Sequence, residues 1–192
     1  SELLYARASG TPHSGEGRFL RPAAPAYRDA AHLPWRLRRE TGGEGYFCDM
    51  APHTLDILDF LLGEIDHAQG CAVNRGGLYE VADTVTASFR FRSGVAGTGT
   101  WCFVAPEAER ADSIRITGSR GTLHLATFSF EPLELTTPAG TKRFTYAQPE
   151  HIQGPLIGTI VDELRGVGQC PSTGVSAART SRVMDLILRG EA

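Results

Sequence analysis

The segment GGEGYFCDMAPHTLDILDFLLG, residues 42–63, decides the fold of this chain. Its apolar side chains recur at the period of an α-helix, which predicts a helix that buries one face. The members of this apolar stripe are Phe47, Met50, Ala51, Thr54, Ile57, Leu58 and Leu61. Gly63 is expected to end the helix. Pro52 is expected to kink or break it, because proline removes one backbone hydrogen bond and crowds the carbonyl of Cys48.

A second stripe of the same helix contains polar side chains that could act in catalysis. Its members are Tyr46, Asp49, His53, Asp56 and Phe60. Asp49 and His53 are four residues apart, so their side chains share one face of the helix. An imidazole that titrates near neutrality can take a proton from a hydroxyl, and a neighbouring carboxylate can fix its tautomer. Structural pairs of polar residues show the same spacing, so the pair is a hypothesis for a catalytic site.

Three further residues are candidates for binding. Asp56 could complete a metal site with Asp49 and His53, although a helix cap or a surface ion pair is the interpretation we favour. Trp35 and Arg36 could form a substrate clamp, in which an aromatic wall stands beside a fork-shaped donor. The alternative is a packing tryptophan beside a solvated arginine.

The remaining motifs favour structural roles. Gly42, Gly43 and Gly45 precede the helix but match neither dinucleotide nor phosphate-loop spacing, so we expect them to allow close backbone packing. No serine nucleophile elbow and no His-Glu-x-x-His motif occur. The other histidines are interpreted as structural or solvated. They are His13, His32, His67, His124 and His151.

Composition indicates one soluble globular domain. The 192 residues are 41% hydrophobic and 21% charged, with a formal net charge of −3, which argues against nucleic acid or an anionic membrane as the main partner. No apolar run is long enough to span a membrane. The four cysteines lie far apart without a Cys-x-x-Cys pair, which favours reduced thiols and a cytoplasmic location over a disulfide framework or a zinc site.

Most of the chain is expected to form a sheet. Residues 2–8 resemble a strand, and residues 9–34 are interpreted as a long surface excursion. A two-residue period begins after the helix, with strands at 65–74, 84–92 and 95–103. Hairpin turns are predicted at Ser93-Gly94, at residues 118–121 and at residues 138–140. The second face of this sheet is rich in Thr, Ser and Gly, which predicts a face that is solvated or covered by another subunit.

Two more helices are expected near the end of the chain. The first starts at Gly154-Pro155 and ends at Gly166, with an inward apolar stripe. The members of that stripe are Leu156, Ile157, Ile160, Val161 and Leu164. The second runs from Ser176 to Leu188, with Val183, Leu186 and Ile187 facing inward. Helices gathered at the ends of a mostly antiparallel open sheet predict an α+β fold.

The order of these motifs resembles the Gfo/Idh/MocA oxidoreductases, the relatives of glucose–fructose oxidoreductase and inositol dehydrogenase. The resemblance covers nearly the whole chain. It is carried by Trp35-Arg36, residues 43–56, Leu62-Gly63, residues 81–84, Ser93-Gly94, residues 116–123 and residues 171–174. Glu44 and Ala51 stand where that family's signature has glycine, which would narrow the pocket.

The resemblance implies a fold and a function. The implied fold is that of the family's second domain, an open sheet with helices on one face, as in the C-terminal domains of dihydrodipicolinate reductase and glyceraldehyde-3-phosphate dehydrogenase. Residues 1–192 would be a single substrate-binding and oligomerisation domain, forming a homodimer or homotetramer through the open sheet. By analogy, His53 acts as acid/base on a sugar or polyol hydroxyl and Asp49 orients substrate and histidine. Trp35, Arg36 and Asp56 are the implied substrate-binding residues.

The same resemblance implies a cofactor and a missing half. NAD or NADP would be bound by an N-terminal dinucleotide-binding domain, which would also supply a lysine, and neither feature occurs in this sequence. We therefore expect the isolated chain to be inactive and to bind NAD weakly. Two rival hypotheses remain, a non-catalytic binding or assembly module of the same fold and a metal-dependent hydrolase or lyase using Asp49, His53 and Asp56.

Overall fold

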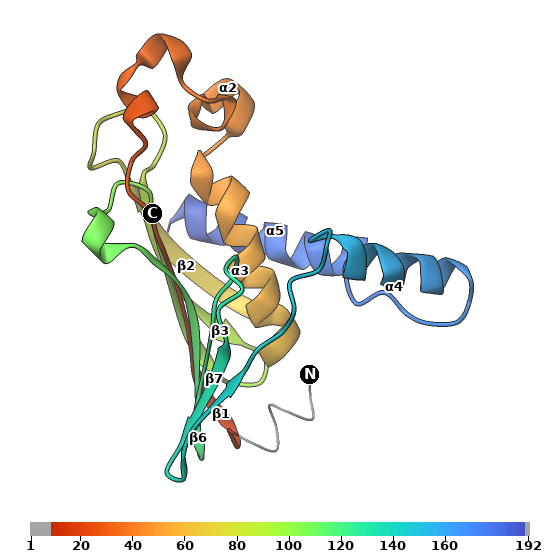
Figure 1. Ribbon diagram of the computed structural model, residues 1–192. Helices are drawn as coiled ribbons and strands as arrows, with labels where there is room; N and C mark the ends of the chain where they lie inside the picture. The colour runs from red at the N-terminus through yellow and green to blue at the C-terminus, as the bar shows by residue number, and fades with distance from the viewer. Residues whose placement is uncertain (1–8, 191–192) are drawn as a thin grey trace.

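Eight strands form one open sheet in the computed structural model, which describes residues 9–190 (Figure 1). The spatial order of the strands is β2-β3-β4-β1-β5-β6-β7-β8. Only the pairing of β1 with β4 is parallel, and every other neighbouring pair is antiparallel. The strand bounds are β1 Pro12–Leu20, β2 Ile65–Val73, β3 Thr84–Phe91, β4 Ala96–Cys102, β5 Ala111–Gly118, β6 Gly121–Leu125, β7 Leu133–Thr137 and β8 Gly140–Phe144. The predicted α+β fold and its three hairpin turns are confirmed.

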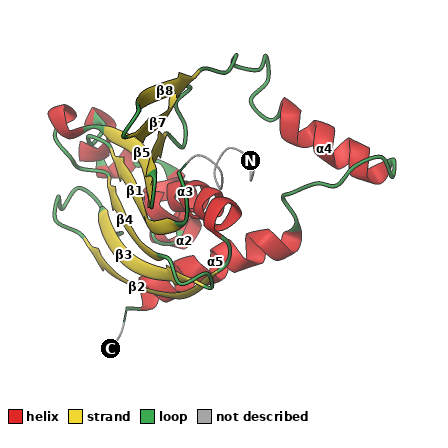
Figure 2. Cartoon of the chain, turned by 90° about the horizontal axis from the view of Figure 1, so that it is seen from below, coloured by secondary structure: helices red, strands yellow, loops and turns green. Residues whose placement is uncertain are grey.

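The two longest helices lie against one side of this sheet (Figure 2). The α-helices are α2 Arg39–Gly42, α3 Tyr46–Leu62, α4 Gly154–Leu164 and α5 Gly174–Arg189. Four short 3₁₀ helices are η1 Pro25–Arg28, η2 Ala30–His32, η3 Trp35–Leu37 and η4 Glu107–Glu109. The other side of the sheet presents alternate, mostly exposed residues such as Thr86, Ser88 and Thr98. It is therefore the mildly polar face that the sequence predicts.

Strand β1 corrects the interpretation of residues 9–34 as a surface excursion. It is a central strand, paired with β4 on one side and β5 on the other. Its inward positions include Gly15 and Gly17, which lie directly under α3. A Cβ atom at Gly15 would lie 2.9 Å from Leu62 Cδ1, and one at Gly17 would lie 2.7 Å from Thr54 Cγ2. Glycine is required here because the helix presses on the strand. The strand expected at residues 2–8 lies outside the described residues.

Helix α3 runs unbroken through Pro52, so the expected break is wrong. An interior proline costs about 3 kcal/mol, but α3 buries side chains that include Phe47, Leu55 and Leu58. Each fully buried large apolar side chain contributes about 1.5–3 kcal/mol, so packing outweighs the cost. Phe47 meets Trp101 of β4 edge to face, with ring centroids 5.2 Å apart.

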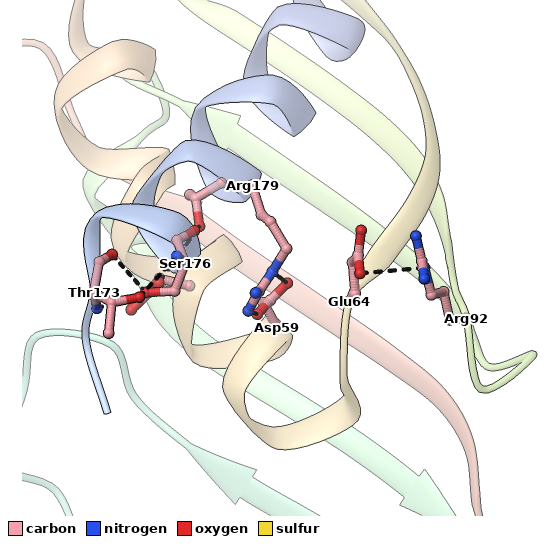
Figure 3. Close-up of polar contacts among 8 residues, drawn as sticks. Asp59, Glu64, Arg92, Thr173, Ser176 and Arg179 are labelled. Carbon is pink, nitrogen blue, oxygen red and sulfur yellow. Dashed lines mark hydrogen bonds and ion pairs between the residues drawn. The ribbon is translucent and has the colours of Figure 1, made fainter. Parts of the chain in front are cut away.

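Helix α5 contacts α3 through charged and polar side chains (Figure 3). Arg179 donates to both carboxylate oxygens of Asp59, at 2.6 and 3.2 Å, while Val183 and Ile187 are buried in the core. Thr173 and Ser176 form a reciprocal capping box at its start, which satisfies free backbone N–H groups. Leu186, also expected to face inward, is half-buried.

Helix α4 forms where the sequence predicts it, but its apolar stripe does not face inward. The five residues of that stripe are all exposed. No described helix or strand packs closely against α4, and in both views it lies apart from the sheet (Figures 1 and 2). The prediction that this stripe joins the core of the domain is therefore wrong.

Candidate functional site

The candidate site begins at η3, where α2 fixes the backbone of Trp35 and Arg36. The Thr41 hydroxyl donates to the carbonyl of Trp35 at 2.7 Å. A Cβ atom at Gly42 would lie 2.3 Å from the carbonyl oxygen of Arg36, so only glycine allows α2 to pack this closely. The site's first two side chains are thus placed by contacts to their own backbone.

Arg36 joins α3 through Asp49. Its Nε donates to the Asp49 carboxylate at 2.7 Å, and both side chains are about one-third exposed, at 38% and 34%. The guanidinium of Arg36 also lies over the Trp35 ring, 4.4 Å from the centroid. Stacking and ion pairing hold a planar cation in one orientation. The structure therefore brings Trp35, Arg36 and Asp49 together.

His53 lies one turn further along α3 and is exposed. Its ring meets the ring of Phe128 edge to face, with centroids 5.1 Å apart. Within residues 9–190, the hydrogen-bond partner found for the Asp49 carboxylate is Arg36 rather than His53. The imidazole thus has a fixed aromatic neighbour and stays open to a ligand.

A carboxylate that the sequence analysis missed positions Phe128. Asp112 accepts three backbone N–H bonds from the loop after β6: from Thr127 at 2.9 Å, Phe128 at 2.8 Å and Ser129 at 3.1 Å. Charge-assisted bonds of this kind are stronger than neutral ones. They fix the loop on which the His53 neighbour sits. Because the contact spans 15 residues, no local pattern around Asp112 reveals it.

A hollow of about 310 Å³ opens beside this loop. It shares Phe128 with His53 and is mostly aromatic. Its lining residues are Phe19, Arg21, Pro22, Tyr27, Tyr46, Met50, Phe103 and Phe128. Concave sites with apolar walls and a few polar groups are typical of small-ligand binding.

Two tyrosine hydroxyls meet in this hollow. Tyr27 donates to the Tyr46 hydroxyl at 2.7 Å. Burial raises the pKa of Tyr27, and the hydrogen bond with Tyr46 raises it further. Tyr27 is therefore a neutral donor at neutral pH, which leaves the proton of Tyr46 available to a ligand. Tyr46 belongs to the polar stripe predicted from the sequence, whereas Tyr27 lies in the segment interpreted as an excursion.

Asp56 is directed toward α5. Its carboxylate accepts a hydrogen bond from the Thr180 hydroxyl at 3.4 Å, so the structure does not bring Asp56 to Arg36 and Asp49. Among residues 9–190 no cluster of three or more His, Cys, Asp or Glu side chains has metal-binding geometry. Asp49, His53 and Asp56 instead contact Arg36, Phe128 and Thr180, respectively. The four cysteines are free.

The glycines before α3 serve packing, as the sequence analysis expected. Gly45 has φ +72°, and a Cβ atom there would lie 2.6 Å from Val81 Cγ2. The segment lies between α2 and α3, without a strand directly before it. A dinucleotide cradle needs the order strand, glycine-rich loop and helix. This glycine segment therefore does not fit the pyrophosphate of a dinucleotide.

Comparisons with known proteins agree with this architecture. Residues 1–124 match the family model for the GFO/IDH/MocA C-terminal domain. Oxidoreductase P35 of Formosa agariphila is 31% identical over 189 residues, covering 96% of this chain and 56% of that protein. The 1,5-anhydro-D-fructose reductase of Ensifer adhaerens is 34% identical over 116 residues, covering 56% of this chain and 34% of the reductase. The chain thus spans about half or less of these relatives.

Solved structures show the same fold at low sequence identity. Levoglucosan dehydrogenase in complex with NADH and levoglucosan has a TM-score of 0.82 and 16% identity, covering 98% of this chain and 58% of the enzyme. An oxidoreductase from Agrobacterium radiobacter, in complex with NAD⁺, L-tartaric acid and magnesium, has a TM-score of 0.78 and 19% identity. It covers 97% of this chain and 56% of that protein.

The open sheet with helices packed on one side is the fold that these solved oxidoreductases share. The chain belongs to the GFO/IDH/MocA oxidoreductase family and carries its C-terminal domain. Its relatives in that family are named oxidoreductases and reductases. Among the described residues, no helix has the length and apolar character needed to cross a membrane.

Proposed function

We propose that this chain is the substrate-binding part of an NAD(P)-dependent oxidoreductase that acts on a sugar, a polyol or a related carbohydrate. The observation that carries the proposal is the exposed His53 beside the aromatic hollow, with Arg36 and Asp49 one turn away. The names of relatives support the substrate class, since one is a 1,5-anhydro-D-fructose reductase. One structural neighbour is a dehydrogenase solved with levoglucosan.

In this proposal the hollow orients a carbohydrate ring. The half-buried ring of Phe128 suits the C–H face of a sugar, and Tyr46 offers a hydroxyl donor in the same hollow. Arg36 and Asp49 present a fixed donor and acceptor pair to further hydroxyl groups. Trp35 is exposed beside this pair and adds an aromatic wall. Asp56 is the weakest of the proposed binding residues, because Thr180 already engages it.

His53 is the proposed acid/base. In oxidation, Nδ1 or Nε2 of the imidazole accepts the hydroxyl proton of the substrate as the carbon loses hydride, and in reduction the imidazolium returns that proton. A bound nicotinamide cofactor would accept this hydride in oxidation and donate it in reduction. Since the described residues form no dinucleotide cradle, its binding falls to residues beyond this chain. We therefore propose that the isolated chain turns over no substrate and binds NAD only weakly.

The remaining proposals concern assembly and location. The exposed Thr and Ser residues of the open sheet form a mildly polar face without packed helices, which we propose as the subunit contact of a homodimer or homotetramer. A cytoplasmic location suits the free cysteines. Neither NAD nor NADP is favoured by any described contact.

The direct test is an assay of the protein at the natural length that its gene encodes. The substrates are levoglucosan, 1,5-anhydrosugars and polyols with NAD⁺ or NADP⁺, and the readout is absorbance of the reduced nicotinamide. The proposal expects turnover with at least one member of this class. Sugar binding measured by calorimetry without any turnover would instead identify a non-catalytic binding module.

A further inference from the structure

A single charged side chain lines the aromatic hollow beside His53. Among the described residues of its wall, only Arg21 is charged, and it is half-buried. Its guanidinium lies over the Phe19 ring, 4.8 Å from the centroid. The backbone of Arg21 continues the pairing of β1 with β4, since its N–H donates to the carbonyl of Cys102 at 2.8 Å. The alternation of the strand then turns Arg21 to the same side of the sheet as Phe19.

Arg21 has no carboxylate partner in the described part of the chain. None of the ion pairs found within residues 9–190 includes it. Its charge does act on Glu107, whose pKa is lowered chiefly by hydrogen bonds with Arg110 and in smaller part by the charges of Arg110 and Arg21. Arg110 engages both oxygens of Glu107, at 2.6 and 2.7 Å. A guanidinium carries five N–H donors, so Arg21 keeps donors for a ligand.

Two aromatic contacts connect Arg21 to the proposed acid/base. The Phe19 ring under the guanidinium meets Phe128 edge to face, with centroids 5.1 Å apart. Phe128 in turn meets His53, also with centroids 5.1 Å apart. Arg21 and His53 therefore lie at the two ends of one aromatic pair, and a ligand in the hollow is within reach of both.

We propose that this hollow selects a sugar acid, a carbohydrate that carries a carboxylate, and that Arg21 binds the carboxylate. The inference rests on the proposed function and specifies its substrate class. The guanidinium fork matches the two oxygens of a carboxylate, and the Tyr46 hydroxyl supplies a further donor in the same hollow. Apolar walls exclude water, which strengthens an ion pair formed between them. The volume of about 310 Å³ suits a single sugar ring.

The charge of the hollow favours a carboxylate over a phosphate. A phosphate group carries about −1.5 to −2 charges at neutral pH, and Arg21 is the only cation among the described wall residues. Much of the phosphate charge would therefore lack a partner inside an aromatic wall. A carboxylate carries one charge, which Arg21 balances. A neutral sugar would leave the half-buried guanidinium without an anionic partner.

Steady-state kinetics of the natural-length protein with NAD⁺ or NADP⁺ tests this inference on matched pairs of compounds. The pairs are D-galacturonate with D-galactose and D-gluconate with D-glucitol. At least one acid is expected to exceed its neutral partner at least about tenfold in kcat/KM, because a charge-assisted hydrogen bond contributes about that factor.

The substitution Arg21→Gln is expected to raise KM for that acid by about 10- to 100-fold and to leave kcat nearly unchanged, since it removes binding that the ground and transition states share. The KM of the neutral partner should stay the same, which also shows that the variant is folded. Arg21→Lys keeps the charge and should recover part of the affinity. The matched control is Arg182→Gln, at an exposed arginine of α5, which should change neither compound.

Calorimetric titration of the same proteins with the same compounds separates the possible failures. Turnover of neutral sugars with no preference for acids would overturn the inference and leave the proposed function standing. An acid preference that survives Arg21→Gln, or tighter binding of D-glucose 6-phosphate than of either sugar acid, would overturn the inference too. Binding of a sugar acid that Arg21→Gln abolishes, in a protein without any turnover, would support the anion site and overturn the oxidoreductase function.

Discussion

Arg36 Nε donates to the Asp49 carboxylate at 2.7 Å across 13 residues of sequence. This bond links the segment before α2 to the first turn of α3. It also places the Arg36 guanidinium between the Trp35 ring and the Asp49 carboxylate. Asp49 also lies where the helix dipole favours an anion. Trp35, Arg36 and Asp49 therefore behave as one unit.

Replacing Arg36 by lysine tests whether this geometry matters beyond its charge. Lysine keeps the charge but loses the planar fork and the stacking on Trp35. We expect kcat/KM of the natural-length enzyme for its sugar to fall about tenfold, while stability changes by less than about 1 kcal/mol because the pair is partly exposed. Steady-state kinetics and urea denaturation measure the two effects. Arg90→Lys, in an exposed pair with Asp66, is the control, and equal kcat/KM for both variants would contradict the assigned role.

Removing Asp112 should loosen the loop that carries Phe128. Asp112→Ala deletes an acceptor of three backbone N–H bonds, and we expect the free energy of unfolding to fall by about 2 kcal/mol. Amides of residues 127–129 should exchange faster. Asp66→Ala, which removes only an exposed ion pair, should cost less than about 1 kcal/mol. Similar losses for the two variants would show that Asp112 does not organise the loop.

Two glycine substitutions separate backbone strain from steric clash. Gly45 and Gly63 both have positive φ, at +72° and +93°, but only Gly45 has a neighbour within reach of a Cβ atom. Gly63→Ala should cost about 1–3 kcal/mol from strain alone. Gly45→Ala should cost more, since Val81 must also move. Urea denaturation of both variants measures the difference, and the opposite ranking would contradict the packing described at Val81.

The Tyr27 hydroxyl predicts a pH dependence of stability. Because burial and Tyr46 raise its pKa above that of the unfolded chain, its contribution is fully present below about pH 10, the ordinary tyrosine value, and is lost as pH rises toward the folded value. Tyr27→Phe should therefore lose less stability than the wild type between pH 8 and pH 10.5. Chemical denaturation at several pH values measures this. Equal losses of stability in the two proteins would mean that Tyr27 titrates normally. Burial also raises the pKa of Tyr79, but Tyr79 is present in both proteins and does not affect the difference between them.

The sequence predicts most strands because their inward residues are large. Val85, Phe89 and Phe91 alternate with exposed residues in β3 and are buried as expected. In β1 the corresponding positions include Gly15 and Gly17, so the alternation disappears although the strand is central. These glycines face inward because α3 packs directly on them. The local sequence pattern of β1 does not show this long-range contact.

Periodicity also cannot say what a helix packs against. The apolar positions of α4 predict the helix correctly, and the structure leaves the same positions exposed. The candidate site shows a similar division. The four-residue spacing of Asp49 and His53 identifies the polar stripe, whereas Phe128 and Tyr27 reach it through contacts between distant segments. Such contacts become visible only in the folded chain.

The most direct test of the central claim is the turnover of His53→Ala in the natural-length enzyme. If His53 exchanges the substrate proton, kcat should fall by about 10²–10⁴, the usual range for a lost general acid/base, while the KM for nicotinamide cofactor stays unchanged. His67→Ala, at an exposed histidine of β2, should retain full kcat. A His53→Ala enzyme with turnover near that of the wild type would contradict the assignment of His53 as acid/base.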